Sequence, residues 1–285
     1  MSRPNTATLL LRCPDQKGLN AAIANLLVRH NINILDAQQH TDEEAGIFFH
    51  RVYFDVVGMA ASRDQLQKEL AEECARYGME WRLSFAEQKK RVAIFVSKYE
   101  HCIYDLLLRH KVGELNCDIP LIISNHEDVR YFADVFKIPY FVFPINKDNK
   151  HEQELKEIAL LQEYNIDLIV MARYMQVLSD SMINCFPNRI INIHHSTLPA
   201  FKGAKPYHQA FERGVKLVGA TAHYATADLD EGPIIAQGVE GSSHEDTIED
   251  LVRKGRDIER VTLAQAVRAH LDDKIIVYGH RTIVF

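Results

Sequence analysis

Five compact apolar segments in the second part of the chain constrain its fold more than any other feature. Helical patterns separate most of them, for example at residues 102–111, 129–136 and 150–164. Short continuous apolar runs suit strands that are buried on both faces of a parallel sheet. We therefore predict an open, mostly parallel α/β sheet, in which ligands bind outside the carboxyl ends of the strands. The five segments are residues 91–97, 119–124, 140–143, 167–172 and 189–194.

The first part of the chain follows a different pattern. Its strand and helix signals run in the order βαββαβ, which is that of a ferredoxin-like sandwich with two helices on one face of a four-stranded antiparallel sheet. Ser62 and Gln65 have the spacing of a capping box at the start of the second helix. We therefore divide the chain into a first domain at residues 1–86, a linker at 87–91 and a second domain at 92–285.

Composition excludes several classes of function. The formal net charge of −6 argues against a surface that follows nucleic-acid phosphates. The five cysteines are scattered and form no C-x-x-C pair, so neither a disulfide framework nor a thiolate zinc site is expected. No apolar stretch approaches the roughly 20 residues that span a bilayer. We expect a cytoplasmic protein with reduced thiols, whose partners are small molecules or copies of itself.

Polar side chains appear where the last of the five apolar segments ends. Because side chains of a strand alternate with period two, Asn192 and His194 project from the same face. His195 points to the other face if the strand persists that far, so the adjacent histidines do not suit one metal ion. A turn cap and a surface histidine are the commoner roles of such residues taken singly, but the pair at the end of a strand favours a binding site.

A second polar cluster occupies residues 221–233. Its carboxylates Asp228, Asp230 and Glu231 lie next to a Gly-Pro turn and could belong to a solvated loop. A carboxylate paired with an imidazole would instead favour the imidazolium and fix the orientation of the ring. Such a pair suits proton transfer near neutral pH.

These residues resemble the signature of the folate-dependent formyltransferase family. The resemblance rests on Asn192-Ile193-His194-His195-Ser196, on Leu198-Pro199, and on His223 seven residues before Asp230, and it covers roughly residues 90–285. It implies a Rossmann-like domain in which an Asn, a His and an Asp surround the formyl group, which map to Asn192, His194 and Asp230. For His223, orientation of Asp230 or of the substrate and a buried structural role remain alternatives.

Residues 172–178 resemble the family's folate pocket, where main-chain groups hold the pterin-like ring. By that similarity, the substrate site is lined by Arg173, Tyr174, Met175, Gln176, Val177, Leu178, His223, Thr226 and Asp228. Three further residues, Lys202, Lys205 and His208, are candidates to meet the glutamate tail of a folate. A solvated basic loop is the alternative for them.

Departures from the family indicate which acceptor receives the formyl group. Family members that act on a ribonucleotide carry a glycine-rich phosphate loop after the first strand. Here residues 97–102 contain no glycine, and Glu100 would repel a phosphate. Members that act on transfer RNA append a C-terminal barrel, whereas this chain stops soon after its last apolar segment at 274–285. Water is the acceptor that remains.

The first domain also supports water as the acceptor. Its turn from Asp15 to Gly18 into a helix, with Asn33 in the next strand, resembles an amino-acid-sensing ACT-type domain. An ACT-like domain ahead of a formyltransferase-like domain is the arrangement of the formyltetrahydrofolate deformylase family. The resemblance implies hydrolysis of 10-formyltetrahydrofolate to formate and tetrahydrofolate, which supplies formate for purine synthesis and balances the one-carbon folate pools.

The resemblance also implies partners. No cofactor or metal is expected, since the folate derivative is the substrate. An amino-acid effector is expected near Asp15, Gly18 and Asn33, with a homo-oligomer of even subunit number, and a domain that only pairs subunits is the alternative. Two other functions stay open: transfer of the formyl group to an amine, and a non-catalytic folate or amino-acid sensor.

Overall fold

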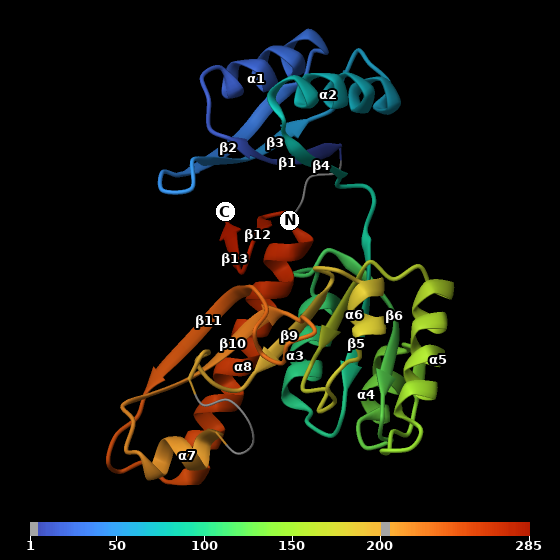
Figure 1. Cartoon of the computed structure of the whole chain (residues 1–285). Helices are drawn as coiled ribbons and strands as arrows, with labels where there is room; N and C mark the ends of the chain where they lie inside the picture. Colours follow the sequence, from blue (N-terminus) through green and yellow to red (C-terminus); the bar gives the residue numbers. More distant parts are fainter. Residues whose placement is uncertain (1–4, 201–205) are drawn as a thin grey trace. The chain divides into compact units, whose positions relative to one another are not determined.

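The structure is a computed structural model that describes residues 5–200 and 206–285. It divides into two units (Figure 1). The first unit holds the chain up to Lys89 together with Asp272–Tyr278 and Ile283–Phe285. The second unit holds Lys90–Leu271 and Gly279–Thr282.

The first unit is the predicted ferredoxin-like sandwich. Its sheet has the order β2-β3-β1-β4, every neighbouring pair is antiparallel, and α1 and α2 cover one face (Figure 1). The predicted ferredoxin-like arrangement is thus confirmed. The elements are β1 (Thr6–Pro14), α1 (Leu19–Arg29), β2 (Asn33–Asp42), β3 (Ile47–Asp55), α2 (Arg63–Tyr77) and β4 (Glu80–Phe85).

Local sequence explains where the helices of this unit begin and end. The Ser62 hydroxyl accepts a hydrogen bond from the main-chain N–H of Gln65 at 3.1 Å, so Ser62 caps α2 as its sequence predicts. Gly78 ends the same helix in the left-handed region at φ 63°, where glycine carries no steric penalty. The buried apolar residues of α1 and α2 pack on Leu9 and Leu11 of β1.

The opposite face of this sheet is covered by the end of the chain. Leu10 points away from the helices because its neighbours Leu9 and Leu11 point toward them. Leu10 and Phe49 form a small buried cluster with Ile276, which lies on β12 (Ile275–Tyr278). The predicted boundary, which gave all of 92–285 to the second domain, therefore differs from the structure: an apolar outer face needs a cover, and the last segment supplies it.

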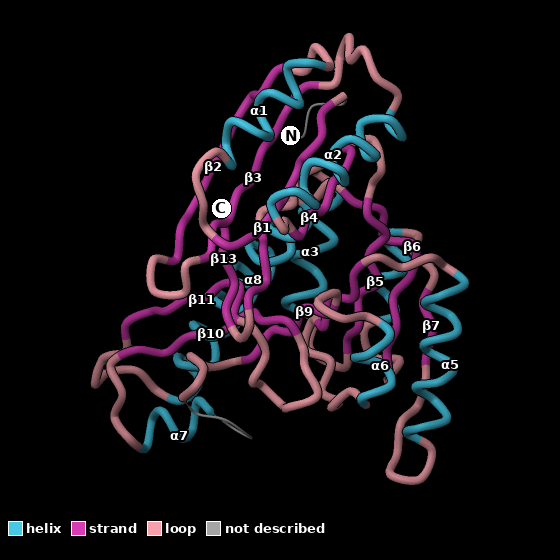
Figure 2. Tube along the Cα trace, turned by 45° about the horizontal axis from the view of Figure 1, so that its top comes forward, coloured by secondary structure: helices cyan, strands magenta, loops and turns pink. Residues whose placement is uncertain are grey.

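The second unit contains the predicted parallel sheet. Its strand order is β11-β10-β9-β8-β5-β6-β7. Figure 2 labels each of these strands except β8. The five strands from β9 to β7 are parallel, and β10 and β11 extend the sheet with antiparallel pairs. The strands are β5 (Lys90–Val96), β6 (Cys117–Ser124), β7 (Tyr140–Val142), β8 (Leu168–Met171), β9 (Ile190–His194), β10 (Leu217–Tyr224) and β11 (Ile234–Gly241).

Helices connect and cover these strands. The longest, α8, packs on β9, β10, β11 and α3 through a stripe of buried residues (Figure 1). The strand order reverses between β8 and β5, where an open sheet of this kind binds its ligand. The helices are α3 (His101–Lys111), α4 (Arg130–Phe136), α5 (Lys150–Glu163), α6 (Asp180–Cys185), α7 (Pro206–Glu212) and α8 (Ile248–Leu271), and β13 (Arg281–Val284) pairs with β12. None of the helices in the described ranges is long and apolar enough to cross a membrane.

Candidate active site

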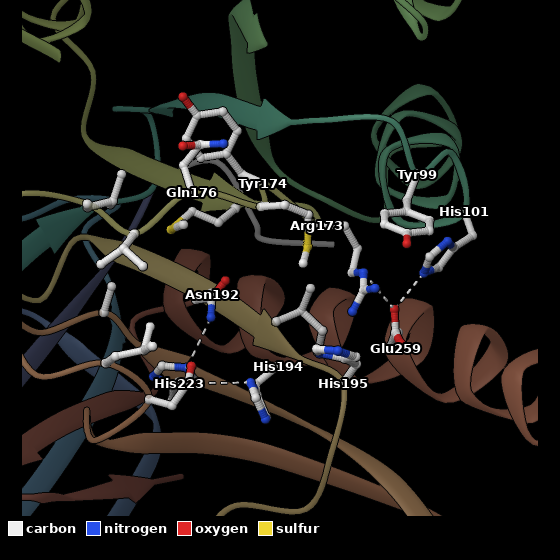
Figure 3. A pocket seen from close by; sticks show the side chains of 18 of the residues that line it. Tyr99, His101, Arg173, Tyr174, Gln176, Asn192, His194, His195, His223 and Glu259 are labelled. Atoms are coloured by element: carbon white, nitrogen blue, oxygen red, sulfur yellow. Dashed lines mark hydrogen bonds and ion pairs between the residues drawn. The ribbon is translucent and has the colours of Figure 1, made fainter. Parts of the chain in front are cut away.

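A cavity of about 500 Å³ opens at the carboxyl ends of the central strands of the second unit (Figure 3). Its walls come from the segments that follow β5 and β8, from the end of β9, from the loop between β10 and β11, and from α8. All three predicted catalytic residues line this cavity, together with eight of the nine predicted substrate residues. The exception is Asp228, which is exposed; its main-chain oxygen accepts a hydrogen bond from the Thr226 hydroxyl at 3.0 Å.

Strand pairing brings Asn192 and His223 together. Residue 192 on β9 lies opposite residue 223 on β10, and the Asn192 amide nitrogen is 3.2 Å from His223 Nε2. His223 Nδ1 is 3.0 Å from the carbonyl oxygen of Tyr224, and because a carbonyl only accepts, Nδ1 carries a proton. In the neutral ring, His223 Nε2 then accepts from Asn192 and leaves the second amide N–H of Asn192 for a ligand.

Asp230 lies between two histidines. Its carboxylate oxygens are 3.2 Å from His194 Nδ1 and 3.6 Å from His223 Nε2. Burial would raise the pKa of Asp230, but the contacts with His194 and His223 outweigh burial and hold that pKa below its usual value. Asp230 is therefore held as a carboxylate beside His194 Nδ1.

The backbone of the loop explains why Asp230 is the carboxylate in this place. Asp230 adopts φ 58°, a left-handed conformation that Asp tolerates better than most residues. Gly232 follows, and a Cβ atom added there would come within 1.7 Å of the Tyr224 carbonyl oxygen. The loop can thus approach β10 only with glycine at 232.

The other ring nitrogen of His194 is available to a substrate. The His194 side chain is 6% exposed, and within the described part of the chain Nε2 is buried and has no hydrogen-bond partner. Buried polar atoms are normally satisfied, so this one marks a ligand position.

Sequence alternation correctly placed Asn192 and His194 on one side. His195 also lines the cavity, because β9 ends at His194 and the alternation ends with it.

Buried polar groups hold the predicted folate loop, residues 172–178, in place. Ser97 donates to Asn125 at 2.7 Å and accepts from the main-chain N–H of Met175 at 3.0 Å. The Tyr174 hydroxyl donates to Glu157 of α5 at 3.0 Å. Burial raises the pKa of Glu157 to about 7, against a lowering effect of the Tyr174 hydrogen bond. Met175 and Val177 remain about half exposed and present an apolar surface to the cavity.

A second polar network on the cavity wall was not predicted from the sequence. Glu259 of α8 is 1% exposed and accepts from the Tyr207 hydroxyl at 2.7 Å. His101 Nε2 is 2.6 Å from the same carboxylate, and Arg173 Nε is 3.5 Å from it. The signal that could have revealed this network is an acidic residue on the apolar stripe of an amphipathic helix, since Glu259 lies among Ile258, Thr262 and Leu263.

His101, Cys102 and Glu259 bring three potential metal ligands within 4.8 Å of one another. Two features disfavour a cation there. Burial, with Glu259, raises the pKa of the Cys102 thiol well above its usual value, so the thiolate ligand is missing. Arg173 already places a positive charge beside Glu259.

The remaining predicted residues lie elsewhere. Asp15 and Asn33 are exposed in the first unit, and Gly18 precedes α1 in a left-handed conformation at φ 96°. His208 lines the cavity from α7. Lys202 and Lys205 lie outside the described residues.

Comparisons with known proteins cover the whole chain. Residues 90–267 match the formyl transferase family, and residues 7–75 match the ACT domain. The chain is 52% identical over 280 residues to a formyltetrahydrofolate deformylase of Synechocystis, with 98% of both chains covered. It is 48% identical over 278 residues to a formyltetrahydrofolate deformylase of Bacillus subtilis, with 97% of this chain and 93% of that one covered.

Solved structures give the same picture. A formyltetrahydrofolate deformylase from Pseudomonas syringae matches with a TM-score of 0.96 at 42% identity, covering 98% of this chain and 94% of that one. A glycinamide ribonucleotide transformylase from Symbiobacterium toebii matches with a TM-score of 0.66 at 30% identity, covering 69% of this chain and 94% of that one.

Proposed function

The chain belongs to the formyltetrahydrofolate deformylase family, and we propose that Asn192, His194 and Asp230 hydrolyse 10-formyltetrahydrofolate in the cavity described above. The products of the reaction are formate and tetrahydrofolate. The predicted resemblance to a formyltransferase-like domain behind an ACT-like domain is confirmed. The observation that carries the assignment of residues is the pairing of Asp230 with His194, which leaves His194 Nε2 buried and unpartnered in the described part of the cavity.

The chemistry follows from these positions. Asp230 orients a water molecule and stabilises protonated His194. Water attacks the formyl carbon while His194 Nε2 takes a proton from it, and the second amide N–H of Asn192 donates to the oxyanion that develops there. The bond between the formyl carbon and the folate nitrogen then breaks, and His194 moves a proton to that nitrogen. His223 is a positioning residue, since it holds the amide of Asn192 and faces Asp230.

The segment that follows β5 supports water rather than an amine-bearing ribonucleotide as the acceptor. It contains Glu100 and no glycine, so it offers no phosphate cradle. Formyl transfer to such an amine is therefore disfavoured, and the set of Asn192, His194 and Asp230 disfavours a non-catalytic sensor.

The direct test uses pure full-length protein with 10-formyltetrahydrofolate in water. Formate release is expected, and formyl appearing on an added amine with no formate would contradict hydrolysis. Asn192→Ala should lower kcat by roughly 10²- to 10³-fold with little change in folate binding, because one oxyanion donor is lost. Glu231→Gln, an exposed change next to Asp230, is the matched control.

We further propose a setting for this reaction. No metal or nucleotide cofactor takes part, since acid, base and oxyanion donor are all side chains of the protein. The formate supplies purine synthesis and its release balances the one-carbon folate pools. The five cysteines are free thiols, which suits the reducing cytoplasm. Nucleic acid and membrane have no part in it.

The first unit acts as a sensor in this proposal. An amino-acid effector binds near Asp15, Gly18 and Asn33, and ACT-like units pair to give a homo-oligomer of even subunit number. Turnover with and without added methionine or glycine tests the effector, because allostery requires a coupling free energy whereas assembly alone does not. Light scattering of the pure protein tests the subunit number.

A further inference from the structure

Arg173 is held in a conformation that side chains of its kind seldom adopt. Its φ is 64°, in the left-handed region, and it is 7% exposed. Non-glycine residues in this region carry strain that persists only where the surrounding structure requires it, and such residues gather at functional sites. The unusual backbone directs a guanidinium group into the wall of the cavity (Figure 3).

The positive charge of the Arg173 guanidinium faces a carboxylate, but two of its nitrogen atoms have no hydrogen-bond partner in the described part of the chain. Its nearest carboxylate is Glu259, 3.5 Å from Arg173 Nε, yet both oxygens of Glu259 have closer contacts, with His101 at 2.6 Å and the Tyr207 hydroxyl at 2.7 Å. The Tyr99 ring lies 4.6 Å from the guanidinium carbon. Arg173 Nε and Nη1 are buried and have no hydrogen-bond partner within residues 5–200 and 206–285.

The groups around Arg173 favour a carboxylate as the ligand of its Nε and Nη1 N–H groups. Burial, then Arg173 and His194, lowers the pKa of His195 to about 3, so the adjacent imidazole is neutral and adds no charge. One negative charge from Glu259 faces one positive charge from Arg173. Nε and Nη1 lie on different edges of the guanidinium, so each offers one charge-assisted hydrogen bond to an oxygen of a carboxylate.

We propose that Arg173 forms a subsite for a small monocarboxylate, and that its ligand in turnover is the formate released by hydrolysis. This identity of the ligand rests on the proposed function. Arg173 and His194 line the same cavity, so formate formed at the catalytic residues reaches Arg173 without leaving it. Tyr99 and His101 lie beside Arg173 in the cavity wall (Figure 3), and Tyr207 lines the same cavity.

Binding of ¹³C-labelled formate to the full-length protein without folate is the direct test, followed by NMR line broadening. Arg173→Asn is the main variant, because Asn tolerates a positive φ and removes the guanidinium. Its formate affinity should fall by about 10- to 100-fold, as expected for the loss of charge-assisted hydrogen bonds. Arg253→Gln removes an exposed charge from α8 and should bind formate like the wild type. Labelled acetate, which is one methyl group larger, should bind more weakly than formate.

Equal formate binding by the wild type and Arg173→Asn, or absence of binding by the wild type, would overturn the subsite. If circular dichroism shows that Arg173→Asn does not fold, Arg173→Lys is the second variant. It keeps the charge but lacks the Nε and Nη1 donors, and it should bind formate at least several-fold more weakly. Formate release from 10-formyltetrahydrofolate is measured separately. Hydrolysis without formate binding refutes the subsite and leaves the function intact, whereas binding through Arg173 without hydrolysis refutes the function and supports a carboxylate site.

Discussion

Replacing Glu157 with Gln should remove much of the pH dependence of stability in the second unit. Glu157 is fully buried on α5, and one of its oxygens accepts from the Tyr174 hydroxyl at 3.0 Å. The other oxygen has no partner among the residues that the structure describes. Burial raises the pKa of Glu157 to about 7 from its usual 4.5, and nearby Glu154 adds to the effect.

The sign and size follow from proton linkage. The folded state binds this proton more tightly than the unfolded state, so the stabilisation is complete below about pH 4.5 and is lost as the pH rises through about 7. A pKa difference of this size corresponds to about 3 kcal/mol, at ~1.4 kcal/mol for each pH unit. Glu157→Gln keeps an acceptor for Tyr174 and has no proton to lose. In the Glu157→Gln variant, residue 157 should therefore contribute little to any change in the free energy of unfolding between pH 5 and 8.

The assay must follow the second unit. The chain has one tryptophan, Trp81, and it lies in the first unit, so intrinsic tryptophan fluorescence would report the wrong transition. Urea unfolding at each pH, followed by a hydrogen-exchange pulse at one fixed pH, reads the amides of α5 and β8 directly. Glu163→Gln, an exposed change near the end of the same helix, is the control.

Tyr174→Phe supplies an independent check. Removing the hydroxyl takes away the hydrogen bond that lowers the pKa of Glu157, so the loss of stability should extend to higher pH than in the wild type. Parallel curves of unfolding free energy against pH for the wild type and Glu157→Gln would refute the reasoning, since a carboxyl group that ionises alike in both states contributes no slope.

Three other changes probe the site. Asp230→Asn should lower kcat by about 10³- to 10⁴-fold, because a buried carboxylate that orients a catalytic histidine is lost; steady-state formate release measures this, and a loss below tenfold would contradict the pairing with His194. Gly232→Ala should lower kcat by about 10²-fold although all polar groups remain, because the added Cβ displaces the Asp230 loop. Wild-type kinetics in a folded variant would show that the close approach of this loop to β10 is not required. Exhaustive treatment with EDTA should leave hydrolysis unchanged, and activity that disappears and returns with one metal would refute a mechanism carried by side chains alone.

Much of the fold follows from short-range patterns. The strands of the parallel sheet are apolar runs with clear ends, and Ser62 caps α2 as its spacing with Gln65 predicts. The shared orientation of Asn192 and His194 can be predicted from the period of a strand alone. The end of a strand is harder to predict: His195 lines the cavity beside His194 because β9 stops one residue earlier than the alternation requires.

Other parts of the site depend on contacts that no local pattern contains. Asp228, Asp230 and Glu231 are equivalent acids in the sequence, and only the left-handed backbone at 230 and the close approach at Gly232 select one of them. The same holds for Arg173 and Glu259, which come from segments far apart in the chain. Their meeting is decided by how α8 packs on the sheet.

The return of the chain end to the first unit sets an order on synthesis. Leu10 and Phe49 are synthesised before Lys90–Leu271, whereas Ile276, which buries them, is synthesised after that segment. During synthesis the emerging first unit can form its helix-covered face, while the apolar groups of its outer face stay exposed until β12 has been made. The nascent chain therefore exposes an apolar surface throughout the synthesis of Lys90–Leu271, and β12 is the segment that later covers this surface.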